Sequence, residues 1–343
     1  MTQSFTLTPA QLMAKVEAIF IAAGLPAEQA APVARVIVAG ERDACKSHGI
    51  YRIEGCLRTL KMGKVNPNAQ PVLTQNETAI VRVDAKGGFS NAAFELGAPA
   101  LAERAKTMGI AALVINDCTH FSALWPEVEA LTAHGLAAIA MCPSYATVAP
   151  TGGTKALMGT NPLAFGWPRA GNPYVFDFAT SVAARGEVEL HRIAGKPLPD
   201  GWALDADGEP TNDPAAALQG AMLPFGGHKG SAISMMIELL AGVMIGDMTS
   251  PEALAFLGTT TVAPRHGELI IAFCPDRFAA AKGGMDPARA EALFDAVLGQ
   301  GARLPSARRF AARAVAEAEG ITLTADEMAM LERLHKGGMD AIS

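Results

Sequence analysis

The stretch from Asp43 to Arg52 gathers three side chains that could do chemistry. Ser47 offers a hydroxyl, His48 an imidazole and Arg52 a guanidinium. Histidine gives and takes protons near neutral pH, and arginine fits a carboxylate with two parallel hydrogen bonds. Gly49 lets the backbone turn sharply or lets a ligand come close. The pattern is consistent with a site for a small 2-substituted carboxylic acid.

The same residues have a simpler structural explanation. His48 and Arg52 lie at the junction of two segments with helical patterns, where both types can cap helix ends at the surface. Taken alone, these few residues favour the structural explanation. The catalytic hypothesis therefore depends on the rest of the chain.

A second candidate is the glycine-rich turn from Gly226 to Gly230, which contains His228 and Lys229 and precedes a predicted helix. Main-chain N–H groups at a helix N-terminus attract anions, and glycines let a phosphate approach. A purely structural turn is about as good an explanation. The turn lacks the spacing of a P-loop, and no Gly-x-Gly-x-x-Gly follows a predicted strand. A dinucleotide, if bound, is therefore not held by the usual Rossmann fingerprint.

A buried carboxylate paired with His48 would hold its tautomer and raise its basicity. Two acids are candidates: Asp177, at the end of a predicted strand over residues 174–178, and Glu187, in a predicted helix over 181–192. Either could equally be a solvated charge, and the residues alone do not choose between them.

The seven histidines give no sign of a metal site. His48, His120 and His228 fall in predicted loops, whereas the other four, His266 among them, are expected at helix ends or on the surface. No spacing typical of metal ligands connects them. We therefore expect no bound metal.

The elements that position these residues change in character near residue 70. Before it, a helix start at Thr8-Pro9-Ala10-Gln11 and apolar residues at helical spacing predict three helices, over about 9–23, 27–43 and 53–63. After it, strands are expected at 79–84, 110–116, 136–142, 174–178 and 269–274, and helices at 91–108, 123–134, 181–192, 231–244, 287–298 and 326–335. Residues 145–166 and 301–309 are expected to be loops, and 205–208 a hairpin turn. The alternation predicts a mixed α/β fold with a helical layer.

Composition narrows the functional class. The chain has 343 residues, a formal net charge of -6 and no basic stripe, which argues against a nucleic-acid partner. Its longest apolar stretch, residues 232–245, is too short to span a membrane, and Met1–Thr8 has no secretory pattern. The five cysteines are scattered, as in a reduced compartment. We expect a cytoplasmic protein with neither nucleic-acid nor membrane partners.

With these pieces placed, nearly the whole chain resembles the malate/L-lactate dehydrogenase-like family of NAD(P)-dependent oxidoreductases that lack a Rossmann fold. Within that family, Ala123–Glu129 and the pattern around Phe225–Ala241 look most like Δ1-piperideine-2-carboxylate/Δ1-pyrroline-2-carboxylate reductases. The motifs that carry the resemblance are Ser47–Gly49 with Arg52, Cys118–Ala123, Gly159–Pro162, Phe176–Ser181 and Pro224–Gly230.

The resemblance implies a homodimer with a nucleotide-binding domain on a largely antiparallel sheet. It implies a helical domain over 1–70 with 300–343, a small α/β domain over 71–120 with 275–299, and an NADPH-binding domain over 121–274. It also implies a proton relay of Ser47, His48 and Glu187, with the substrate held by Arg52 and Thr160. The relatives have an aspartate where Glu187 stands here. The implied cofactor contacts are His120, Phe121, Ser122, Ala123, Leu124, Asp177, Phe178, Ala179, His228, Lys229, Arg303, Arg308 and Arg309.

The leading hypothesis is therefore an NADPH-dependent reductase of cyclic imino acids that forms L-pipecolate or L-proline. One alternative is reduction of an open-chain 2-oxo acid on the same scaffold, and another is a non-catalytic dimeric binding protein. The arginines of residues 301–309 could contact a 2′-phosphate, which favours NADPH, although NADH is possible and the arginines could simply solvate a loop.

Overall fold

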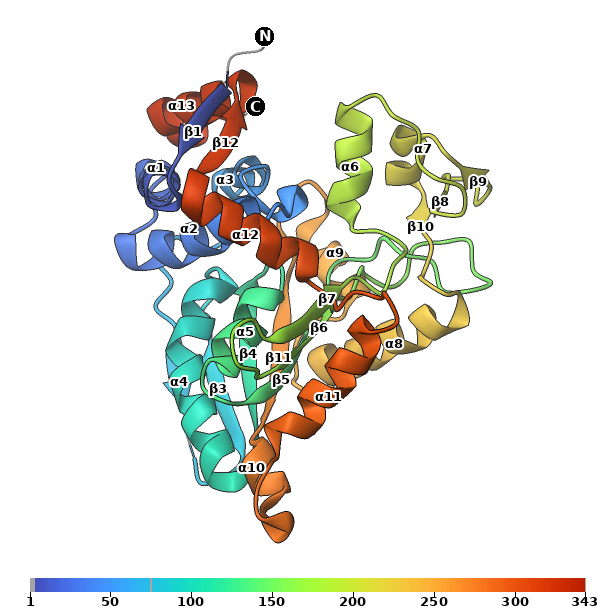
Figure 1. Ribbon diagram of the computed structural model, residues 1–343. Helices are drawn as coiled ribbons and strands as arrows, with labels where there is room; N and C mark the ends of the chain where they lie inside the picture. The colour runs from blue at the N-terminus through green and yellow to red at the C-terminus, as the bar shows by residue number, and fades with distance from the viewer. Residues whose placement is uncertain (1–3, 75, 343) are drawn as a thin grey trace.

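The computed structural model describes residues 4–74 and 76–342, and its centre is a seven-stranded β-sheet (Figure 1). The strand order is β2-β3-β4-β11-β5-β6-β7, and only β3 and β4 run parallel. The expected mixed, largely antiparallel sheet is thus confirmed. The strands are β2 (Val72–Thr74), β3 (Ile80–Asp84), β4 (Ile110–Thr119), β5 (Ala137–Met141), β6 (Leu163–Trp167), β7 (Tyr174–Phe178) and β11 (Arg265–Phe273).

Helices cover both faces of this sheet. Helices α4 (Ser90–Met108) and α5 (Trp125–Thr132) pack on one face, where Leu113 and Ile115 point. Helix α8 (His228–Glu238) and the π-helical turn η2 (Leu239–Val243) pack on the other, against Val114. Because successive strand residues point to opposite faces, a strand covered on both sides is apolar on both, as β4 is from Ile110 to Ile115.

The first and last segments of the chain form the expected helical layer, seen as the neighbouring blue and red helices in Figure 1. Thr8 caps its first helix with the predicted capping box. A two-stranded sheet of β1 and β12 joins the two ends of the chain. The elements are β1 (Ser4–Leu7), α1 (Pro9–Ala22), α2 (Ala27–Arg42), the 3-10 helix η1 (Lys46–His48), α3 (Arg52–Lys61), α12 (Ala307–Glu319), β12 (Ile321–Thr324), α13 (Ala325–Gly337) and η4 (Gly338–Ala341).

A smaller unit lies beside this layer and contains α6 (Arg185–Ile193), α7 (Pro214–Gln219) and a three-stranded sheet (Figure 1). The predicted turn at Asp205–Gly208 joins two of its strands as a hairpin. Its strands are β8 (Ala203–Leu204), β9 (Pro210–Thr211) and β10 (Ala221–Met222). The remaining helices are α9 (Ser250–Leu257), α10 (Pro275–Phe278), η3 (Ala280–Lys282) and α11 (Pro287–Leu298).

Strands from both 71–120 and 121–274 share the central sheet. The domain boundaries expected from the sequence stay a prediction. Within the described residues, no helix combines the length and the apolar character needed to cross a bilayer.

Four expectations about individual elements were wrong. Residues 163–167 form strand β6 rather than a loop. The glycine at position 166 reflects close packing, because a Cβ there would lie 2.9 Å from a methyl group of Thr132 on α5. The helix expected from residue 181 begins at Arg185, because the Val182 N–H is bonded to the Leu223 oxygen. Arg308 and Arg309 begin helix α12 rather than end a loop. His266, expected on the surface or at a helix end, is buried in β11.

Candidate active site

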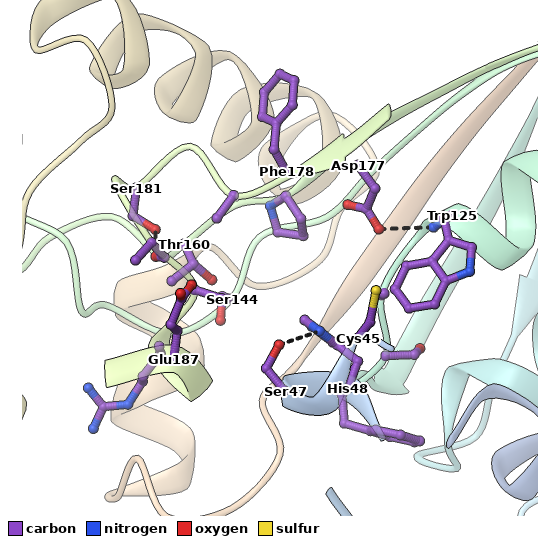
Figure 2. Close-up of a pocket in the computed structure, with 18 of the residues that line it drawn as sticks. Cys45, Ser47, His48, Trp125, Ser144, Thr160, Asp177, Phe178, Ser181 and Glu187 are labelled. Atoms are coloured by element: carbon purple, nitrogen blue, oxygen red, sulfur yellow. Dashed lines mark hydrogen bonds between the residues drawn. The ribbon is translucent and has the colours of Figure 1, made fainter. Parts of the chain in front are cut away.

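A cavity of about 1050 Å³ lies where the helical layer, the sheet and α6 meet. Ser47 and His48 of η1 reach it from the helical layer, and Asp177 comes from the end of β7 (Figure 2). Arg52 of α3 also lines it. The predicted site residues that line the cavity are Ser47, His48, Arg52, His120, Phe121, Ser122, Ala123, Thr160, Asp177, Phe178, Ala179, Glu187, Arg303, Arg308 and Arg309. Residues distant in the sequence thus converge on one site.

Ser47 and His48 form a hydrogen-bonded pair. Ser47 Oγ lies 3.2 Å from His48 Nδ1, and the imidazole meets the Trp125 ring edge to face at 6.2 Å. Two glycines let this pair lie close to α2, because a side chain at either position would collide. A Cβ on Gly40 would lie 2.3 Å from the His48 carbonyl oxygen, and one on Gly49 would lie 2.0 Å from a Glu41 oxygen. The sequence predicted that Gly49 allows a sharp turn or the approach of a ligand; in the structure the group that approaches it is the Glu41 side chain.

Arg52 is anchored at one side and open at the other. Its Nε donates to the Ser47 main-chain oxygen at 2.7 Å. Gly186 keeps α6 clear of it, since a Cβ there would lie 3.3 Å from Nη2. Among residues 4–74 and 76–342, no carboxylate forms an ion pair with Arg52, so its terminal nitrogens remain available to an acidic ligand. Arg52 thus does bond a carbonyl oxygen of η1, as the structural explanation expected, but both it and His48 are half-buried and line the cavity.

His48 is electrostatically poised as a neutral base. Burial lowers its pKa to about 3, and the positive charge of Arg52 acts in the same direction. A carboxylate ligand on Arg52 would oppose that second contribution. Such a ligand would raise the pKa of His48 from that low value, although burial, the larger cause, would still act to lower it.

Neither candidate acid is hydrogen-bonded to His48 in the described chain. Asp177 instead accepts from the main-chain N–H groups of Leu124 and Trp125, at 2.8 and 3.0 Å, and so binds the start of α5. Burial raises the Asp177 pKa to about 6, outweighing those two bonds. Glu187 is exposed on the cavity wall, in the turn of α6 that approaches Ser47.

The segment from His120 to Leu124 is fixed at both ends. His120 is 3% exposed and approaches Glu268, whereas the Leu124 N–H is held by Asp177. Between them, Phe121 packs edge to face on Phe89. Leu124 itself is fully buried and does not line the cavity.

The predicted phosphate contacts separate into three groups. His228 and Lys229 are exposed at the start of α8 and do not line the cavity. Arg303 and Arg308 line it with exposed side chains. Arg309 is buried, with ion pairs to Asp43, at 3.1 Å, and to Glu129.

Thr160 sits in a rigid segment. Its carbonyl oxygen accepts from the Thr180 N–H at 2.8 Å. The next residue, Asn161, has φ +31° and is buried, and its Nδ2 donates to Glu238 at 2.8 Å. The substrate contact expected at Thr160 thus lies on backbone that its neighbours hold in place.

Several cavity residues were not predicted from the sequence. Trp125, Cys142, Tyr145, Arg185 and His266 all line the cavity. Trp125 could have been found from the sequence, because it lies within the Ala123–Glu129 stretch that carries the family resemblance. The other four have ordinary local patterns and reach the cavity only through the tertiary fold.

Comparisons with known proteins place this geometry in context. The model of the family described as malate/L-lactate dehydrogenase matches residues 7–332. A Δ1-pyrroline-2-carboxylate reductase from Agrobacterium fabrum is 70% identical over 345 residues, covering 100% of both chains. A Δ1-pyrroline-2-carboxylate/Δ1-piperideine-2-carboxylate reductase from Pseudomonas aeruginosa is 58% identical over 85% of this chain and 87% of its own.

A solved structure shows the same likeness in three dimensions. The crystal structure of Δ1-piperideine-2-carboxylate reductase from Pseudomonas syringae superposes with a TM-score of 0.90 at 41% identity. The match covers 96% of this chain and 99% of that one.

Proposed function

This chain belongs to the malate/L-lactate dehydrogenase family, as its motifs indicated, and we propose that it is an NADPH-dependent reductase of cyclic imino acids. The substrates are Δ1-pyrroline-2-carboxylate, reduced to L-proline, and Δ1-piperideine-2-carboxylate, reduced to L-pipecolate. The observation that carries the proposal is a cavity with Ser47, His48 and an Arg52 that has no ion pair within the described residues, in a chain 70% identical end to end to a pyrroline-2-carboxylate reductase.

Each group has a role in this proposal. Arg52 binds the substrate carboxylate through its terminal nitrogens, because Nε is engaged by Ser47. Ser47 holds His48 through Nδ1, which leaves Nε2 to manage the proton at the substrate nitrogen. Thr160 contacts the substrate from the opposite wall. Glu187 acts on the relay only after a movement, or through water, since it is not bonded to either residue in this structure.

The cavity fits a nicotinamide cofactor together with a small acid. Its volume exceeds what an imino acid needs and lies at the upper end of ligand sites. The cofactor, when bound, supplies the hydride that reduces the C=N bond. We assign NADPH because Arg303 and Arg308 line the cavity without ion-pair partners in the described chain and suit a 2′-phosphate. His228 and Lys229 reach a bound cofactor only if it extends beyond the cavity toward the start of α8.

We also infer a homodimer in the cytoplasm. The outer side of α8 and η2 exposes Met235, Met236, Leu239, Val243 and Met244 by 38–60%, and monomers rarely expose such a continuous apolar surface. A second copy of the chain is the occupant we assign to it. The cytoplasm is supported by five cysteines that are all free thiols. Light scattering of the wild type and of Val243→Glu tests the dimer: the variant should be monomeric.

The catalytic proposal is tested by following NADPH oxidation with each imino acid and with pyruvate. We expect turnover with one or both imino acids and little with pyruvate, and we expect His48→Ala to abolish most of it. A clear preference for pyruvate would establish the 2-oxo acid alternative instead. NADPH binding without turnover of any of these compounds would point to a binding protein.

A further inference from the structure

Glu127 and Glu268 bring two carboxyl groups together in the interior beside the cavity. Glu127 lies in the first turn of α5 and is 4% exposed; Glu268 lies on β11 and is fully buried. One carboxylate oxygen from each and a ring nitrogen of His120 lie within 4.8 Å of one another. Two ionised carboxylates at this distance in a dry interior would repel each other strongly.

The atoms that face one another here have no conventional hydrogen-bond partner among the described residues. They are Glu127 Oε2, both Glu268 oxygens and His120 Nε2, which lies 3.6 Å from Glu268 Oε2. Buried polar atoms without partners are rare in folded proteins. A proton or an ion shared by these four atoms would satisfy their hydrogen-bonding or charge requirements.

A single proton on the carboxyl pair does so. A protonated Glu127 would donate to ionised Glu268, and an N–H at His120 Nε2, 3.6 Å from Glu268 Oε2, would point to the same carboxylate. His120 Nδ1 then faces the Cys142 thiol, whose sulfur lies 4.0 Å away and can donate to it. In this network of Glu127, Glu268, His120 and Cys142, each donor faces an acceptor. The single negative charge, on Glu268, is buried between two donors.

The Glu127–Glu268 pair lies beside His120, the first residue of the segment from His120 to Leu124. His120 begins that segment, and Glu127 is on the helix that follows it. The far end of the segment is held separately by Asp177. The pair therefore fixes the wall of the cavity that we assign to the cofactor, without itself lining the cavity.

We propose that Glu127 and Glu268 share one proton and, through His120, position the 120–124 segment for the dinucleotide. Both are positioning residues, with Glu127 the proton donor and Glu268 the charged acceptor. The cofactor part of this inference depends on the proposed function, whereas the shared proton does not.

The charges around the pair agree with that assignment. Burial, followed by the charge of Glu268, raises the pKa of Glu127 well above its usual value. Burial opposes ionisation of Glu268 too, but the neighbouring Glu127 carboxyl group and the nearby imidazole of His120 lower its pKa. The other titratable groups that interact with the pair are His266, Cys118, Cys142 and Asp177. His266 is kept neutral, since burial lowers its pKa to about 4.

Two substitutions at one position test the donor. Glu127→Gln keeps an N–H donor of the same shape, and Glu127→Leu removes it. We expect the glutamine variant to bind NADPH within about twofold of the wild type, and the leucine variant to bind about tenfold more weakly. Glu268→Gln, which removes the acceptor charge, should match the leucine variant. Fluorescence titration of the full-length protein measures all three.

The pH dependence of unfolding tests the proton without using the cofactor. Folded wild type holds a proton on Glu127 that the unfolded chain releases above about pH 4.5. Its stability relative to Glu127→Gln should therefore fall as pH rises above about 4.5, and level off only above the raised pKa of folded Glu127. Parallel melting curves against pH for these two proteins would overturn the shared proton.

Two further results would overturn the proposal. One is equal NADPH affinity for Glu127→Gln and Glu127→Leu. The other is a stoichiometric divalent metal in the purified protein that both Glu127→Gln and Glu268→Gln lose, since the same atoms could ligate an ion. If wild type fails to bind NADPH but the melting curves diverge as expected, the cofactor assignment fails and the shared proton stands.

Discussion

Arg52 donates from Nε to the main-chain oxygen of Ser47, at 2.7 Å, immediately beside the Ser47–His48 hydrogen bond. The proposed carboxylate clamp and the proposed proton-transfer pair are therefore directly linked by a hydrogen bond. A change at Arg52 that moved the Ser47 backbone would also disturb His48. Variants at these positions must for this reason separate binding from proton transfer.

Arg52→Lys keeps the positive charge but loses the planar fork that binds a carboxylate with two hydrogen bonds. We expect KM for the imino acid to rise about tenfold or more, equivalent to about 1.4 kcal/mol, with a smaller change in kcat. Steady-state kinetics measures the split. An equal loss in kcat, with KM unchanged, would place Arg52 in the chemistry rather than in substrate binding.

His48→Ala should lower kcat by roughly 10²–10⁴-fold and leave NADPH affinity near the wild-type value. A thermal melt serves as the control for folding. Turnover at the wild-type rate would remove His48 from the mechanism.

The depressed pKa of His48 gives a second signature. Because folding lowers that pKa to about 3, the unfolded chain binds the extra proton between about pH 3 and 6.5. The His48 contribution to stability is thus present above pH 6.5 and lost as pH falls through this window. His48→Ala should unfold with a flatter pH dependence there, and denaturant titrations at pH 4.5 and 7 compare the two proteins.

Local patterns predicted most of the scaffold. The capping box at Thr8 and the apolar spacing of α1, α2 and α3 depend on neighbouring residues, and these helices form close to where expected. Strand β6 was missed because Gly166 resembles a loop residue, while its real cause is the close approach of α5. That cause lies in tertiary packing, which no local window contains.

The candidate site likewise contains residues that local sequence patterns reveal and residues that only the tertiary fold brings together. Ser47, His48 and Arg52 are close in sequence and could be recognised together. The partners of Asp177, by contrast, are the main-chain amides of Leu124 and Trp125, and main-chain amides carry no residue-type signal. His266 was assigned to the surface because nothing near it in the sequence shows that β11 is the central strand.

Asp177→Asn should change the pH dependence of stability. Burial raises the Asp177 pKa from 3.8 to about 6, so the folded state keeps a proton that the unfolded chain has lost in this range. The Asp177 contribution therefore falls as pH rises from about 4 to 6. The asparagine does not titrate, and its unfolding free energy should decline less over that range in urea titrations. A steeper decline than in wild type would contradict the assignment.

Arg303→Ala and Arg308→Ala should each weaken NADPH more than NADH. We expect wild type to prefer NADPH by at least about tenfold in kcat/KM, or about 1.4 kcal/mol, and the paired variant to lose most of that preference. Kinetics with both cofactors provides the measurement. Equal kcat/KM for NADPH and NADH in wild type would refute the selectivity.

Arg309 should behave differently from its neighbour, because it supports the fold beneath the cavity. Its guanidinium pairs with Asp43 and Glu129 and lies 5.0 Å from the Trp125 ring centre. The Asp43 side chain is fully buried, and although burial would raise its pKa, bonds from Arg313 and Arg42 keep it lowered. Those partners remain in Arg309→Ala, so we expect a loss of about 3 kcal/mol in unfolding free energy, at the low end for a broken buried pair.

Arg308→Ala is the matched control for Arg309→Ala, since its exposed side chain has no ion pair in the described chain. It should change stability by less than about 0.5 kcal/mol. The Arg309→Ala protein should keep its ratio of NADPH to NADH kcat/KM, measured well below its melting temperature. Loss of that ratio without loss of stability would make Arg309 a phosphate contact and reverse the two assignments.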